Sequence, residues 1–168
     1  MTSATSATTA TSTLRPYLNF TAESRQALGF YQSIFGGELT VLTFAQGGAL
    51  PTEHPAADLC MHAELRAEVV HLLASDAPEG VAPQALVRGN DMHLCLQTDD
   101  VETGRSWFEA LSEGGQAHMP FEAQAWGDAF GMLTDRFGTR WMVYASLGAG
   151  GQATGDGPTG AEAGSQGS

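Results

Sequence analysis

The chain has 168 residues and a formal net charge of −12, because 19 acidic residues stand against only 7 basic ones, all of them arginine. This acidic balance argues against nucleic-acid partners and anionic membrane surfaces, which both require basic patches. No apolar run approaches the roughly 20 residues of a membrane-spanning helix, and the length suits one domain or two small halves that share a core.

Both ends of the chain have compositions that predict flexible tails. Residues 1–13 contain only Met, Thr, Ser and Ala, and residues 147–168 are rich in Gly, Ala and Ser. Neither segment offers enough apolar area to offset the entropy lost on ordering a chain. The first segment also lacks the basic start and apolar stretch of a secretory signal. We therefore expect a folded core over residues 14–146 in a cytoplasmic protein, with Cys60 and Cys95 as reduced thiols.

The first half of the core predicts a strand, a helix and three further strands over residues 14–76. Residues 14–20 alternate and contain a proline, which suits a strand. Apolar residues then recur at steps of three and four up to residue 35, which predicts a helix capped by Thr21 and ended by Gly36 and Gly37. Strands are expected at 39–44, 59–65 and 69–74. A linker with two prolines and two glycines follows at 77–91.

The second half, residues 92–146, repeats this order. Residues 92–98 alternate, and Asp99 or Asp100 can cap a helix that ends at Gly114 and Gly115. Strands are expected at 116–121, 129–134 and 140–145, with a hairpin turn at 135–138.

The repeat predicts an α+β fold made of two tandem βαβββ modules. A four-stranded sheet with one helix leaves one concave face uncovered, so two such halves side by side should enclose a shared, half-barrel cleft.

Short segments in the core carry a family likeness. They are Pro16-Tyr17-Leu18-Asn19-Phe20, Phe30-Tyr31, Phe35-Gly36-Gly37, His62-Ala63-Glu64-Leu65, Ser75-Asp76-Ala77, Thr98-Asp99-Asp100-Val101, Met119-Pro120, Trp126-Gly127, Phe130-Gly131-Met132, and Thr134-Asp135-Arg136-Phe137-Gly138 with Trp141. In this order they resemble the vicinal oxygen chelate superfamily (glyoxalase I, bleomycin-resistance proteins, extradiol dioxygenases), and within it the PhnB-like branch. The resemblance implies a glyoxalase-like fold of paired modules, usually in a homodimer. Some branch members are labelled methyltransferases, but this chain has no Gly-rich loop between a strand and a helix to hold a methyl donor.

The resemblance also raises the question of a metal. Catalytic members of the superfamily bind one divalent metal through four side chains, and the corresponding positions here are Arg15 or Pro16, His71, His93 and Met142. Arginine stays protonated and proline has no ligating atom, whereas imidazole suits zinc, nickel or iron. Glu64 is the nearest carboxylate. The resemblance therefore implies either a divalent metal held by His71 and His93, or a pocket in which these histidines hydrogen-bond a ligand or each other.

Other side chains each allow two interpretations. His62 and Glu64 share a strand face, either as a polar pair in the cleft or as a solvated surface. Trp126 and Trp141 are typical either of a pocket wall or of core packing. Arg136 and Arg140 flank the last hairpin, where each is either solvated or holds an anion in a bidentate fork. The predicted ligand-binding residues are His62, Glu64, His71, His93, Trp126 and Trp141.

Three functions follow as hypotheses. The first is a module that binds a small molecule in the cleft, for which the acidic charge and the aromatic side chains suggest a cationic, partly planar ligand. The second is a metal-dependent lyase, isomerase or dioxygenase that uses His71 and His93. The third is an interaction protein whose cleft is filled by its own side chains. We expect the first, without standard glyoxalase activity, because the usual ligand and base glutamates are missing.

Overall fold

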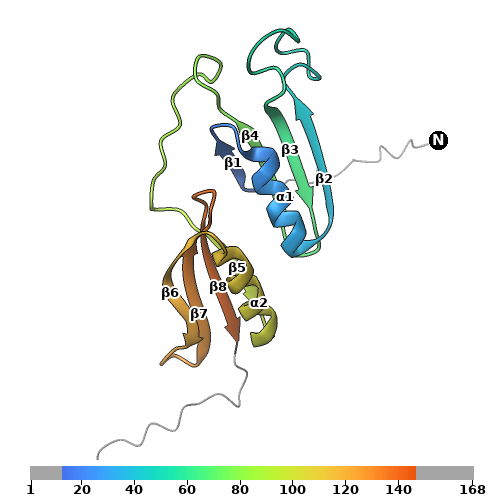
Figure 1. Ribbon diagram of the computed structural model, residues 1–168. Coiled ribbons are helices and arrows are strands. Elements are labelled where there is room, and N and C mark those ends of the chain that lie inside the picture. Colours follow the sequence, from blue (N-terminus) through green and yellow to red (C-terminus); the bar gives the residue numbers. More distant parts are fainter. Residues whose placement is uncertain (1–12, 147–168) are drawn as a thin grey trace, which may run out of the picture.

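Two βαβββ modules follow one another in the computed structural model, which describes residues 13–146 (Figure 1). Module one consists of β1 (Tyr17–Phe20), α1 (Ser24–Phe35), β2 (Glu38–Thr43), β3 (Cys60–Arg66) and β4 (His71–Asp76). Module two consists of β5 (Leu94–Thr98), α2 (Val101–Ser112), β6 (Gln116–Ala123), β7 (Asp128–Thr134) and β8 (Arg140–Ser146). This confirms the predicted α+β class and the internal repeat. The tails predicted at the two ends fall outside the described residues, apart from Thr13.

Each module forms one open four-stranded sheet. The strand orders are β1-β4-β3-β2 and β5-β8-β7-β6, so β1 and β5 are edge strands at equivalent positions. Each of these two strands pairs in parallel with the last strand of its module, and the other pairs are antiparallel. A parallel pair requires a crossover connection, and in each module the crossover contains the helix. Neither sheet closes into a barrel.

One face of each sheet is buried against the helix of its own module. Along β4, Leu72 and Ala74 are buried while His71 and Leu73 are half-buried. Module two repeats the pattern along β8, whose buried residues alternate with half-buried ones. This alternation is the period of two expected for a strand with one covered face. The second face of each sheet, called here the outer face, carries the half-buried residues.

The two helices begin in different ways. The predicted Thr21 cap is wrong, because α1 begins at Ser24 and its N-cap residue, Glu23, makes no capping hydrogen bond. Instead, Asp76 at the end of β4 accepts the backbone N–H of Ser24 at 2.9 Å and that of Cys60 at 2.8 Å. In α2 the prediction of Asp100 is confirmed, because its side chain accepts the N–H of Glu102.

The first strand of each module is shorter than predicted. Residues 14–20 were expected as a strand, yet β1 begins at Tyr17. Pro16 has no N–H to donate to a ladder, although its carbonyl accepts the N–H of Leu73 at 3.1 Å. Similarly, β5 begins at Leu94 rather than at residue 92. The residues left out of these strands remain close to the junction between the modules.

A buried polar and aromatic cluster joins the modules. Tyr31 of α1 is fully buried, and its hydroxyl donates to Asp135 Oδ2 at 2.6 Å and hydrogen-bonds Thr139 Oγ1 at 2.9 Å. The Tyr31 ring packs edge-on against Trp141 of β8, whose Nε1 donates to the same Asp135 oxygen at 2.9 Å. Burial is the main reason that the pKa of Tyr31 lies far above its usual range, so this phenol remains a donor.

Among the helices of residues 13–146, none is long and apolar enough to cross a membrane.

Candidate functional site

A groove lies between the modules, where the edge strands β1 and β5 approach each other. It consists of two adjoining cavities of about 350 Å³ and 580 Å³. The residues that line both cavities are Pro16, Tyr17, Met92, His93 and Leu94. We call the two cavities together the inter-module groove. Its shared wall consists of residues that precede or begin β1 and β5. The groove is therefore formed by two segments that lie far apart in the sequence.

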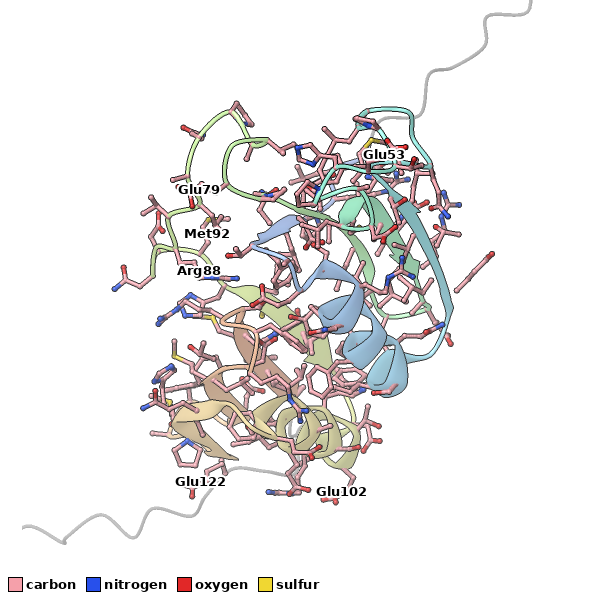
Figure 2. All side chains as sticks on the ribbon, turned by 45° about the horizontal axis from the view of Figure 1, so that its top comes forward. Glu53, Glu79, Arg88, Met92, Glu102 and Glu122 are labelled. Atoms are coloured by element: carbon pink, nitrogen blue, oxygen red, sulfur yellow. The ribbon has the colours of Figure 1, made fainter. Side chains whose placement is uncertain are left out.

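The linker between the modules supplies a further wall of the first cavity. Leu86, Val87 and Arg88 line it together with Phe20 of β1 and the hairpin before β8. Figure 2 shows Arg88 and Met92 on this linker, beside the junction of the two modules. The second cavity is lined mainly by apolar side chains, namely Val69, Val70, Leu72, Leu96 and Trp141 in addition to the shared residues. Cavities of this size with apolar walls and a few polar groups are typical of small-molecule sites.

His93 is the predicted site residue that lines both cavities. Its Nε2 accepts a hydrogen bond from Arg140 Nε at 3.1 Å. Because an arginine is always protonated, this bond uses the Nε2 lone pair and places the imidazole proton on Nδ1. Burial lowers the pKa of His93, and the charges of Arg140 and His118 lower it further. His93 is therefore a neutral imidazole at the wall of the groove.

His71 and Glu64 form a separate pair on the outer face of sheet one. His71 Nε2 lies 2.6 Å from Glu64 Oε1, and Arg66 donates to the same carboxylate at 3.0 Å. These hydrogen bonds, that of Arg66 first, lower the pKa of Glu64 to about 2. His71 lies on the opposite face of β4 from Leu72, which lines the groove. The structure of one chain thus does not bring His71 and His93 into a common cavity.

The residues present do not fit the divalent metal that the fold family implies. The Nε2 of His93 is committed to Arg140, and Glu64 is committed to His71 and Arg66. Over the described range of the chain, no three His, Cys, Asp or Glu side chains gather closely enough to hold a metal ion. The other two family positions hold Arg15 or Pro16 and Met142, which offer no ligand for a hard cation.

The remaining predicted site residues lie in three different places. His62 lies on β3, where its Nδ1 is 3.2 Å from the hydroxyl of Tyr17. Trp126 is 61% exposed and packs edge-on against Phe130 near the start of β7. Trp141 is buried, so it serves the core and contributes to the wall of the second cavity. Arg88 and Met92 were not predicted as site residues. The available signal for Arg88 was a large side chain within a linker rich in Ala, Pro and Gly, whereas Met92 was expected at the start of a strand that in fact begins at Leu94.

The comparisons with known proteins agree with this architecture. Residues 15–143 match the Glyoxalase/Bleomycin resistance protein/Dioxygenase superfamily, and the chain belongs to that superfamily. Protein YjdN of Escherichia coli (strain K12) is 31% identical over 143 residues, which cover 77% of this chain and 92% of YjdN. The crystal structure of protein PA1353 from Pseudomonas aeruginosa is 34% identical, with a TM-score of 0.68, over 81% of this chain and 98% of that one.

A PhnB protein from Bacillus cereus is also similar in fold. It matches with a TM-score of 0.62 and 18% identity, over 80% of this chain and 100% of its own. The match over residues 15–143 confirms the predicted superfamily, and a PhnB protein is among the structural neighbours of this chain.

Proposed function

We propose that this protein binds a small molecule in the inter-module groove and lacks standard glyoxalase chemistry. The observation that carries this proposal is the pair of adjoining cavities, about 350 Å³ and 580 Å³, that share the wall formed by Tyr17, His93 and Leu94. Cavities of this volume also argue against the hypothesis of a cleft filled by the protein's own side chains. A cytoplasmic location is part of the proposal, and it is supported by the two free thiols, Cys60 and Cys95.

The two cysteines make the proposal testable in the intact protein. Cys95 is exposed and lines the second cavity, whereas Cys60 is buried in the core and burial raises its pKa to about 11. A thermal-shift screen with small carboxylates, amides and amines should give compounds that raise the melting temperature by mass action. We expect those compounds to slow the alkylation of Cys95 by iodoacetamide, measured by mass spectrometry, while Cys60 serves as the unreactive internal control.

A matched pair of variants locates the binding. Met92 is 77% exposed and lines both cavities, so Met92→Trp should obstruct the groove. Met119 is 38% exposed on β6, so Met119→Trp introduces the same side chain away from the groove. We expect Met92→Trp to abolish the thermal shift and Met119→Trp to retain it. Stabilising compounds that leave both the Cys95 rate and the NMR signals of His93, which lines both cavities, unchanged would refute the groove as the site, and so would compounds that bind Met92→Trp as well as the parent protein.

The second candidate function is that of a divalent-metal-dependent lyase, isomerase or dioxygenase with His71 and His93 as ligands. The observation in its favour is that His71 and His93 occupy two of the positions where the resemblance places metal ligands, whereas the contact of His71 with Glu64 and that of His93 with Arg140 count against it. Metal analysis of protein purified without a histidine tag tests it. We expect less than one metal ion per chain and no change in metal content on His93→Ala. A stoichiometric metal that His93→Ala removes would establish this function instead.

A further inference from the structure

We infer that the inter-module groove selects an anionic small molecule and that Arg88 and Arg140 hold its carboxylate or phosphoryl group. This inference rests on the proposed function, because it names the class of ligand for that same groove. It also reverses the expectation of a cationic ligand. That expectation followed from the net charge of the chain, whereas a bound ligand responds first to the groups that surround it.

The charges that line the groove have the opposite sign to the charge of the whole chain. Arg88 and Arg140 line the first cavity, and Arg15 lines the second. No aspartate or glutamate lines either cavity, although the chain contains 19 acidic residues. Asp91, the acid nearest in sequence to His93, lines neither cavity, although its Oδ1 lies beside Gly89, which lines the first one. The groove is thus a local positive region on an acidic protein.

The arginines of the groove have no carboxylate partners within residues 13–146. The arginine ion pairs there are those of Arg66 with Glu64, Arg105 with Glu102 and Arg136 with Glu113. The three arginines that line the groove are in none of them. A guanidinium presents a planar fork of donors that matches a carboxylate or a phosphate. An anionic ligand would therefore supply the partner that the chain itself does not provide.

Arg140 is held in a defined orientation on sheet two. Its Nε donates to His93, so the two terminal nitrogens are not used by this bond and are available to a ligand. Across the same end of the sheet, Thr134 lies opposite Arg140 in the β7–β8 register, and His118 hydrogen-bonds Thr134 Oγ1 at 2.7 Å. The row His93, Arg140, Thr134, His118 contains no acidic side chain. An anion bound at Arg140 therefore meets no like charge from this row.

Arg88 approaches the same cavity from the linker. Its guanidinium carbon lies 5.4 Å from the centre of the Phe20 ring. A Cβ atom added to Gly138, in the hairpin before β8, would lie 3.4 Å from that carbon. Arg88 therefore lies between β1 of module one and the hairpin of module two. The guanidinium thus lies next to the hairpin that leads to Arg140.

Four probes of similar size and different charge test the inference. Benzoate and phenylphosphonate carry the two kinds of anionic group, benzamide is neutral, and benzylammonium is cationic. Affinities are measured by NMR titration at constant ionic strength, with the His93 ring protons and the Cys95 alkylation rate as reporters of groove occupancy. We expect at least one of the two anions to bind about tenfold more tightly than benzamide, and benzylammonium to bind most weakly. The comparison of benzoate with phenylphosphonate decides which anionic group the site prefers.

Charge-matched variants assign the effect to the arginines. Arg88→Gln and Arg140→Gln should each reduce the preference of the anion over benzamide by about tenfold. Arg136→Gln removes the same charge from the same hairpin region, but Arg136 pairs with Glu113 and lines neither cavity, so the preference should remain.

The outcomes separate this inference from the proposed function. Equal affinities for both anions and benzamide, with His93 shifted and Cys95 protected, would overturn the anion selectivity and leave the groove as a binding site. An anion preference that survives in both Arg88→Gln and Arg140→Gln would overturn the assignment to these arginines. No effect of any probe on His93 or Cys95 would refute both the inference and the proposed function.

Discussion

At the scale of single residues, Asp135 shows how one buried carboxylate ties the two modules together. It accepts hydrogen bonds from Tyr31, from Trp141, and from the backbone N–H groups of Phe137 and Thr139. Tyr31→Phe removes one of these donors without changing the shape of the ring. We expect a loss of about 1–3 kcal/mol in the free energy of unfolding, because the partners of the hydroxyl remain buried without it. Urea denaturation followed by fluorescence measures this loss.

Tyr17→Phe is the control for this prediction. The Tyr17 hydroxyl also has a partner, His62 at 3.2 Å, but Tyr17 is 46% exposed and water can replace the bond. Its removal should change the free energy of unfolding by less than about 0.5 kcal/mol. Equal losses for the two variants would show that the Asp135 cluster has no special part in joining the modules.

The protonation of His93 gives a second prediction at this scale. Burial, and then Arg140 and His118, hold its pKa below the ordinary value of 6.5. The unfolded chain therefore takes up this proton at a higher pH than the folded protein does. The contribution of neutral His93 to stability is present above pH 6.5 and is lost as the pH falls from 6.5 through the lower pKa of the fold.

Substitution of Arg140 separates the causes of this pKa shift. Arg140→Gln removes a neighbouring positive charge, so the pKa of His93 should rise, yet it should stay below 6.5 because burial is the larger cause. NMR titration of the His93 ring protons measures both values. Arg136→Gln should leave the titration unchanged. An equal shift in both variants would mean that the net charge of the protein, rather than the contact with Arg140, sets the pKa of His93.

At the scale of secondary-structure elements, the two helices depend on caps of different origin. Asp100 caps α2 from the adjacent position, whereas Asp76 reaches the N-terminus of α1 from the end of β4 and also holds the N–H of Cys60. Asp100→Ala should cost about 1 kcal/mol, as for an exposed N-cap. Asp76→Ala should cost about 3 kcal/mol, because it leaves two N–H groups of different elements without a partner in the core. Thermal and urea unfolding of the two variants provide the comparison, and equal costs would contradict it.

The same pair of aspartates shows which elements the sequence could predict. Asp100 was predictable because a cap next to its helix is a local signal. Asp76 was not predictable, because its two partners are brought to it by the packing of α1 and β3 against β4. The α+β repeat could be predicted because hydrophobic periodicity is also local. The first residues of β1 and β5 could not be predicted, because they depend on which backbone N–H groups hydrogen-bond to a neighbouring strand.

The candidate site was less predictable than the fold for a related reason. His93 was identified from the family resemblance, but its contact with Arg140 depends on the pairing of β5 with β8. The linker residue Arg88 belongs to no periodic pattern, and only the packing of the linker against β1 and the last hairpin makes it part of a cavity.

At the scale of the whole molecule, the net charge of the chain and the charges that line the groove have opposite signs. The chain carries −12, yet three of its seven arginines line the groove and no acidic residue does. The net charge of a protein affects its solubility and the rate at which it encounters a charged ligand, whereas the side chains nearest a bound ion determine whether an anion or a cation binds more tightly. We therefore expect the affinity for an anion to rise with moderate salt, because salt screens the acidic surface that repels the anion. At higher salt the affinity should fall, because the arginines of the groove are then screened as well.

The outer face of sheet two leads to the last prediction, that of a homodimer. Half-buried apolar side chains occupy this face, Phe130 and Met132 on β7 and Met142 and Tyr144 on β8, and α2 covers only the opposite face. The middle of this face is thus an apolar patch, and an exposed patch of this kind is typical of a surface that another chain covers. We expect sedimentation to give a mass of twice 17.6 kDa, about 35 kDa.

A charge placed on that face tests the cause of dimerisation. Phe130→Glu should shift the equilibrium to the monomer, because an unpaired carboxylate would be buried when two such faces meet. Val87→Glu, at an exposed position of the linker, adds the same charge elsewhere and should leave the dimer intact. A wild-type protein that sediments as a 17.6 kDa monomer at every concentration would refute the homodimer. A dimer that survives Phe130→Glu would instead locate the contact on another surface, such as the exposed edges of the two sheets.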